Sequence, residues 1–197
     1  MKKNHYRTLL TIVGVAVLCA AAWLAAPSKT AAFNPIAQPV AQPGNDHRAP
    51  ELPAPLCDSL QVPAGNKVSF HVYAQGVQIY RWNGDSWDFV APVAKLYADA
   101  NFRGKVGIHY GGPTWESNSG STVIGSRVAG CTPDSAAIPW LRLRAVSAKG
   151  PGIFSNTTFI QRVNTTGGLA PATPGSIIGE VAEVPYTAEY YFYRGEN

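Results

Sequence analysis

The stretch HYGGPTWES, residues 109–117, holds the densest group of polar and aromatic side chains in the chain. Its two glycines and one proline make a tight bend, and glycine allows another backbone or a ligand to approach closely. Trp115 beside Glu116 could place a stacking face next to a carboxylate. We therefore predict a ligand-binding site at His109, Tyr110, Trp115 and Glu116. The alternative is a structural loop whose tryptophan closes one end of a barrel and whose glutamate caps a turn.

Two histidines, His71 and His109, lie after residue 56, and each falls in a predicted strand. Together with Glu116 they match the number and type of ligands in a mononuclear metal site. The metal signal is weak, because a strand histidine is more often a partly buried residue with a satisfied hydrogen bond. His109 and Glu116 are also the centre of an alternative interpretation as a hydrolase or metal-dependent enzyme.

No motif for catalysis or cofactor binding accompanies these residues. The chain has no G-x-S-x-G nucleophile elbow, no P-loop and no G-x-G-x-x-G dinucleotide motif. We therefore expect no cofactor, and the motifs leave open whether the protein is an enzyme.

The elements that must position these side chains are predicted to be strands. From Leu60 onward, short runs rich in Val, Ile, Tyr, Phe and Thr are bounded by Gly, Asn, Asp and Ser, which is typical of strands and turns. The spacing of about ten residues favours an all-β fold, an antiparallel sandwich or barrel of about eight to ten strands. The predicted strands are residues 67–73, 77–82, 87–92, 95–97, 105–110, 122–128, 141–146, 158–163, 177–184 and 188–193.

The predicted strand at the end of the chain is unusual, because the segment EYYFYR, residues 189–194, carries aromatic side chains on both of its faces. Such a strand is either buried twice or displays one face to a ligand, a membrane or a partner. We expect burial on both faces.

Residues 1–32 are predicted to be a signal peptide or an uncleaved membrane anchor. Three basic residues, Lys2, Lys3 and Arg7, precede an uncharged stretch at residues 8–26, and small residues follow it. Cleavage after Ala32 is the preferred site, but the apolar stretch is also long enough to span a bilayer. Both alternatives export the rest of the chain, to the periplasm or cell envelope or into the medium.

Two cysteines, Cys57 and Cys131, remain after the leader, and an oxidising compartment favours pairing them in a disulfide. Eight of the 16 prolines lie in residues 27–63, where repeated proline disfavours helices and strands. We therefore predict a Pro-rich linker at residues 33–56 and a single β-domain at residues 57–197.

The net charge of +4 comes from the leader. Removing the four basic residues before residue 33 from the 16 in the chain leaves 12, which equals the number of acidic residues. A neutral chain without Lys/Arg clusters lacks the basic surface that binds nucleic acid. We therefore exclude nucleic acid as the main partner and expect membrane contact only through an uncleaved leader.

Four blocks of the sequence, residues 70–82, 108–125, 138–168 and 184–194, resemble the secreted bacterial and fungal family of domain of unknown function 3455. The resemblance covers essentially all of residues 57–197. It implies an exported single domain and no particular activity, so it assigns no catalytic or binding residues.

These observations together favour an exported β-domain that binds a carbohydrate or another small ligand. The first alternative is an envelope enzyme centred on His109 and Glu116, and the second is a structural or protein-interaction module. A cleft that collects His71, His109 and Glu116 would favour the enzyme. A groove lined by Trp and Tyr without titratable groups would favour the binding module, and the absence of any pocket would favour the structural one.

Overall fold

The computed structural model describes residues 47–196, which form eight strands and one short 3-10 helix. The predicted leader and most of the predicted linker lie outside these residues. No helix in the described range has the length and apolar character that crossing a membrane requires. The elements are η1 (Asp58–Leu60), β1 (Asn66–Trp82), β2 (Trp87–Tyr97), β3 (Lys105–Tyr110), β4 (Thr114–Ser117), β5 (Thr122–Cys131), β6 (Trp140–Lys149), β7 (Thr157–Gly167) and β8 (Val181–Gly195).

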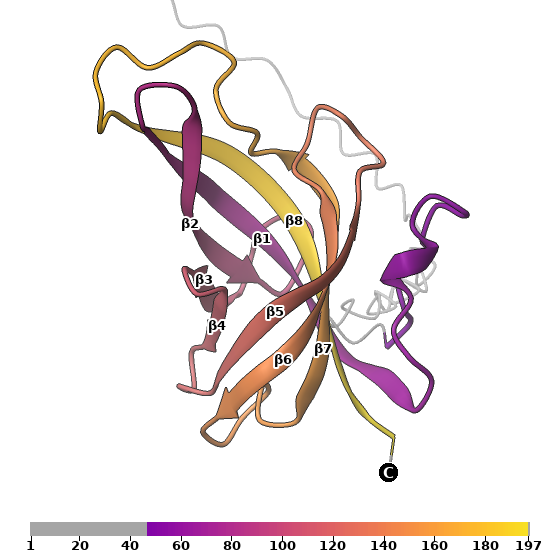
Figure 1. The fold of residues 1–197 in the computed structure, drawn as a ribbon. Helices are drawn as coiled ribbons and strands as arrows, with labels where there is room; N and C mark the ends of the chain where they lie inside the picture. Colours follow the sequence, from indigo (N-terminus) through magenta and orange to yellow (C-terminus); the bar gives the residue numbers. More distant parts are fainter. Residues whose placement is uncertain (1–46, 197) are drawn as a thin grey trace, which may run out of the picture. The chain divides into compact units, whose positions relative to one another are not determined.

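The eight strands form a closed antiparallel barrel in which each strand pairs with the next along the chain (Figure 1). The last strand, β8, returns to pair with β1 from Asn66 to Arg81, and this pairing closes the sheet. Closure satisfies the backbone groups that an open sheet would expose at its edges. The all-β antiparallel prediction is therefore confirmed, and of its two forms the structure has the barrel.

Several predicted strands are parts of longer ones. Residues 67–73 and 77–82 both belong to β1, and the break expected near Gly76 is absent. A Cβ built on Gly76 would lie 2.1 Å from the carbonyl oxygen of Val93, so the glycine permits a close approach of β2 instead of ending the strand. Likewise, β2 joins two predicted strands, and β8 begins at Val181 and includes the predicted strand 188–193.

The strand β4 is a second difference from the prediction, which treated residues 114–117 as a loop. Only residues 111–113 form the turn, and Thr114–Ser117 pairs with both β3 and β5. The polar composition TWES hides this strand, although its side chains still alternate between the two faces of the sheet.

The main core fills the barrel and draws on both aromatic and aliphatic side chains. Its largest members include Trp115, Tyr190 and Phe192, which are almost completely buried. On β8, Tyr190 and Phe192 belong to this core, whereas Tyr191 contacts a smaller cluster that also contains the disulfide. Tyr193 is also buried, and its hydroxyl donates to the side-chain oxygen of Gln161. The expected burial of both faces of residues 189–194 is therefore confirmed.

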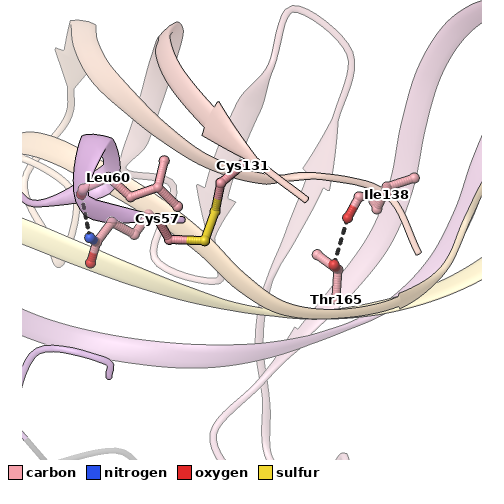
Figure 2. The surroundings of a disulfide bond; sticks show 6 residues. Cys57, Leu60, Cys131, Ile138 and Thr165 are labelled. Carbon is pink, nitrogen blue, oxygen red and sulfur yellow. Dashed lines mark hydrogen bonds between the residues drawn. A yellow bond between two sulfur atoms is a disulfide. The ribbon is translucent and has the colours of Figure 1, made fainter. Parts of the chain in front are cut away.

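The disulfide lies in this smaller cluster, which joins the segment before β1 to β5, β6 and β7. Figure 2 shows Cys57, Leu60 and Cys131 of this cluster. The sulfur atoms of Cys57 and Cys131 are bonded, with Cα atoms 5.4 Å apart, so the predicted pairing is confirmed. Three residues after Cys57, the carbonyl of Leu60 accepts a hydrogen bond of 2.7 Å from the Gln161 side chain of β7. Segments distant in the sequence are thus joined by a covalent bond and a buried hydrogen bond.

Candidate functional site

The hairpin β3–β4 divides the four predicted ligand-binding residues between its two faces. His109 stands opposite Trp115 in the register, and both side chains are buried, at 3% and 1% exposure. Side chains alternate along a strand, so Tyr110 and Glu116 point to the other face. The structure therefore brings together His109 and Trp115 in the barrel, and separately Tyr110 and Glu116 outside it.

Inside the barrel, His109 is held as a neutral ring. Its Nδ1 lies 2.8 Å from the carbonyl oxygen of Thr114, and because a carbonyl only accepts, Nδ1 carries the proton. Burial lowers the pKa of His109 to about 3, and the Thr114 hydrogen bond opposes this shift only in part. The imidazole therefore contributes a flat aromatic face and an Nε2 lone pair, but no positive charge at neutral pH.

On the outer face, the Tyr110 hydroxyl donates a hydrogen bond of 2.9 Å to the Glu116 carboxylate. This hydrogen bond is the main reason that the pKa of Tyr110 is raised, since the carboxylate stabilises the protonated phenol. The pair is partly exposed and joins β3 to β4. Its geometry is that of a cross-strand contact on the surface of the hairpin.

The three residues of the predicted metal site are not brought together. The His71 ring stacks on Tyr191 at a centroid distance of 4.6 Å, and its Nε2 lies 3.6 Å from the Glu189 carboxylate. His109 instead contacts Tyr190, whose side chain lies on the opposite face of β8 from Tyr191. Within residues 47–196, no group of three or more His, Cys, Asp and Glu side chains is arranged to hold a metal ion.

A cavity of about 160 Å³ reaches into the barrel above His109, Trp115 and Tyr190. The barrel wall is low here, because β3 and β4 have only six and four residues, whereas β2 and β5 on either side have 11 and 10 (Figure 1). Most of the lining is apolar, with walls formed by Phe89, Val90, Pro92, residues 111–113, Leu141 and Leu143.

Two arginines also line this cavity, and neither was among the predicted site residues. Arg127 comes from β5 and is exposed, whereas Arg162 comes from β7 and is half-buried. The carbonyl of Pro139 accepts two hydrogen bonds from Arg162, 3.1 Å from Nε and 2.8 Å from Nη2. The sequence does contain a signal for Arg162. It lies two residues after Ile160 in the same strand, so its side chain lies on the same inward face as this core residue.

Tyrosine side chains surround the Arg162 guanidinium. Burial raises the pKa values of Tyr80, Tyr186 and Tyr190, and the positive charge of Arg162 opposes the rise in each case. All three phenols therefore stay protonated at neutral pH. Arg162 and Tyr186 approach the Tyr190 hydroxyl, but within the described part of the chain no group completes a well-formed hydrogen bond with it.

The fold and the cavity define a closed eight-stranded antiparallel barrel with an apolar pocket that opens beside its two short strands, β3 and β4. The model of the family described as protein of unknown function (DUF3455) matches residues 63–194, which is most of the chain and contains all eight strands except the last residue of β8. The chain therefore belongs to this family, as the resemblance of its sequence blocks indicated. No curated protein and no solved structure matches it.

Proposed function

We propose that this protein binds a small, mostly apolar molecule in the barrel cavity. The observation that carries the proposal is the cavity itself, about 160 Å³ in volume, with an aromatic floor of His109, Trp115 and Tyr190. Eight-stranded barrels are just wide enough either to be filled by side chains or to hold one small ligand. A cavity of about this size in another protein is known to take up a molecule as large as benzene.

The lining favours an apolar ligand over a carbohydrate. A sugar carries many hydroxyl groups, and each one removed from water without a partner costs free energy. The walls offer mainly hydrocarbon from Phe89, Val90, Leu141 and Leu143. An enzyme centred on His109 and Glu116 is less well supported, because those two side chains lie on opposite faces of the hairpin.

We further propose that the protein acts outside the cytoplasm, in the periplasm or cell envelope or as a secreted protein. The basic and apolar leader at residues 1–32 supports export. The pairing of Cys57 with Cys131 supports it as well, since disulfides persist in oxidising compartments. The neutral charge of the chain after the leader supports a small-molecule partner in preference to a nucleic acid.

Toluene is a suitable probe, because it is apolar and close in size to the cavity. Its binding should shift the NMR resonance of the Trp115 indole N–H, because the Trp115 side chain lines the cavity. Val90→Trp should abolish this shift, because Val90 is half exposed at the cavity wall and a tryptophan there blocks the entrance.

The matched control is Val93→Trp. Val93 is exposed to a similar degree on the same strand but does not line this cavity, so the variant should bind toluene as the wild type does. The proposal is wrong if saturating toluene leaves the Trp115 resonance unmoved, or if Val90→Trp and Val93→Trp bind toluene equally well.

A further inference from the structure

The cavity contains a positive charge that is built into its wall. In the register, Arg162 of β7 lies between Leu141 of β6 and Tyr190 of β8, and all three line the cavity. An arginine on the inner side of an apolar barrel loses much of its hydration. Burying an arginine in this way lowers the stability of the folded protein unless another group interacts with the positive charge.

The protein itself supplies only part of what this guanidinium needs. Two of its N–H groups donate to the Pro139 carbonyl, which leaves three of the five donors of an arginine side chain. Among residues 47–196, no carboxylate forms an ion pair with Arg162, and no acidic side chain lines the cavity. Arg127 adds a second positive charge to the lining, whereas the buried His109 ring is neutral.

Two residues of the cavity lining also carry a donor that lacks a well-formed hydrogen bond. The Trp115 Nε1–H and the Tyr190 hydroxyl are buried, belong to residues that are each 1% exposed, and have no hydrogen-bond partner in the described part of the chain. Buried donors are nearly always paired in folded proteins, so an unpaired one points to a missing acceptor. These two donors and the Arg162 guanidinium thus all belong to residues that line one small apolar space.

From these observations we infer that the ligand is a small carboxylic acid in its ionised form, with a ring or a short chain as its apolar part. The inference rests on the proposed function, because it names the class of molecule that the same cavity takes. A carboxylate is planar, and its two oxygens can accept two parallel hydrogen bonds from one guanidinium. This paired geometry makes the interaction both stronger and more specific than a single hydrogen bond. The apolar part of such a ligand would contact Phe89, Leu141 and Leu143.

The test compares benzoate with benzamide, which has nearly the same shape and no charge, and with benzylamine, which is a cation. Isothermal titration calorimetry should show benzoate binding at least about ten-fold more tightly than benzamide, since hydrogen bonds to charged groups are stronger than neutral ones. Benzylamine should bind most weakly, because Arg127 and Arg162 repel it.

Arg162→Gln should remove the preference for benzoate over benzamide, because the affinity for benzoate should fall much more than that for benzamide. Arg144→Gln is the matched control, because Arg144 is exposed on β6, is absent from the cavity lining, and its loss changes the net charge equally. If Arg162→Gln fails to fold, Arg162→Lys is the second variant. It keeps the positive charge without the planar guanidinium, so it should retain only part of the preference for benzoate over benzamide.

Equal affinities of the wild type for benzoate and benzamide would overturn this inference and leave the proposed function standing. An undiminished preference for benzoate in Arg162→Gln would overturn it too. If neither toluene nor any of the three probes binds, the cavity takes no small ligand, and the proposed function falls together with the inference.

Discussion

His109 and Trp115 face each other directly across β3 and β4, with ring centroids 4.4 Å apart and planes only 11° from parallel. Tyr190 packs its ring edge against both, at centroid distances of 5.1 and 5.3 Å. Because β8 lies opposite β4 in the closed barrel, these rings connect the short hairpin to the far wall. The same three rings form the cavity floor, so the packing that holds the hairpin also shapes the pocket.

Trp115→Ala should therefore destabilise the protein strongly. Trp115 is 1% exposed and contacts three other aromatic rings, and truncating a buried tryptophan costs about 3–5 kcal/mol in free energy of unfolding. Urea denaturation followed by circular dichroism would measure the loss. Glu116→Gln is the control, because it changes the neighbouring residue on the exposed face and should cost less than about 1 kcal/mol. Similar stabilities for the two variants would show that Trp115 does not hold the hairpin in place.

The buried histidine predicts a specific loss of stability in acid. In the unfolded chain, His109 takes up a proton as the pH falls through about 6.5, whereas in the folded protein its pKa is lowered to about 3. Between these values the unfolded state binds more protons, so the free energy of unfolding decreases as the pH falls, by a few kcal/mol over the whole window. Below about pH 3 this contribution changes no further.

The variant His109→Gln removes the titrating group and keeps an amide N–H that can donate to the Thr114 carbonyl. Its stability should decrease less between pH 7 and pH 4 than that of the wild type, whatever its stability at pH 7. Parallel pH profiles for wild type and His109→Gln would contradict the assignment of a buried neutral ring.

The sequence predicted part of the candidate site because side chains near one another in the chain often act together. It selected His109 and Trp115, which the structure places side by side, and grouped them with Tyr110 and Glu116, which point the other way. This grouping followed from treating residues 114–117 as a loop, because side chains alternate between faces once β4 is recognised as a strand.

The rest of the site depends on how the barrel closes. Phe89, Arg162 and Tyr190 come from β2, β7 and β8, and they meet only because β8 pairs with β1. Local patterns of hydrophobicity give the strands and their inward faces, but the register between distant strands arises from packing of the whole core. For this reason the all-β class and the inward face of Arg162 were predictable from the sequence, whereas the cavity that brings the two arginines together was not.

The disulfide should contribute substantially to stability, because it closes a loop between residues 74 positions apart. The double variant Cys57→Ser/Cys131→Ser should lose about 2–5 kcal/mol, the usual cost of removing a disulfide from a small secreted domain. The melting temperature of the wild type should also fall in reductant, while that of the double variant should not change. A double variant as stable as the oxidised wild type would contradict this expectation.

Gly107 provides the sharpest test of the close approach between β3 and β4. A Cβ built on Gly107 would lie 2.3 Å from the carbonyl oxygen of Glu116, which is backbone that cannot rotate away, so Gly107→Ala must push the strands apart. The strain should cost about 1–3 kcal/mol in free energy of unfolding, because inserting even one methyl into a packed region is unfavourable. It should also displace Trp115, the neighbour of Glu116, and so weaken toluene binding in the cavity.

Gly195→Ala is the matched control, since a Cβ there meets no atom within 4 Å and the same change of residue should leave stability and binding nearly unaltered. Equal stabilities of the two alanine variants would mean that β3 and β4 can separate without cost, and that the hairpin does not hold the cavity floor.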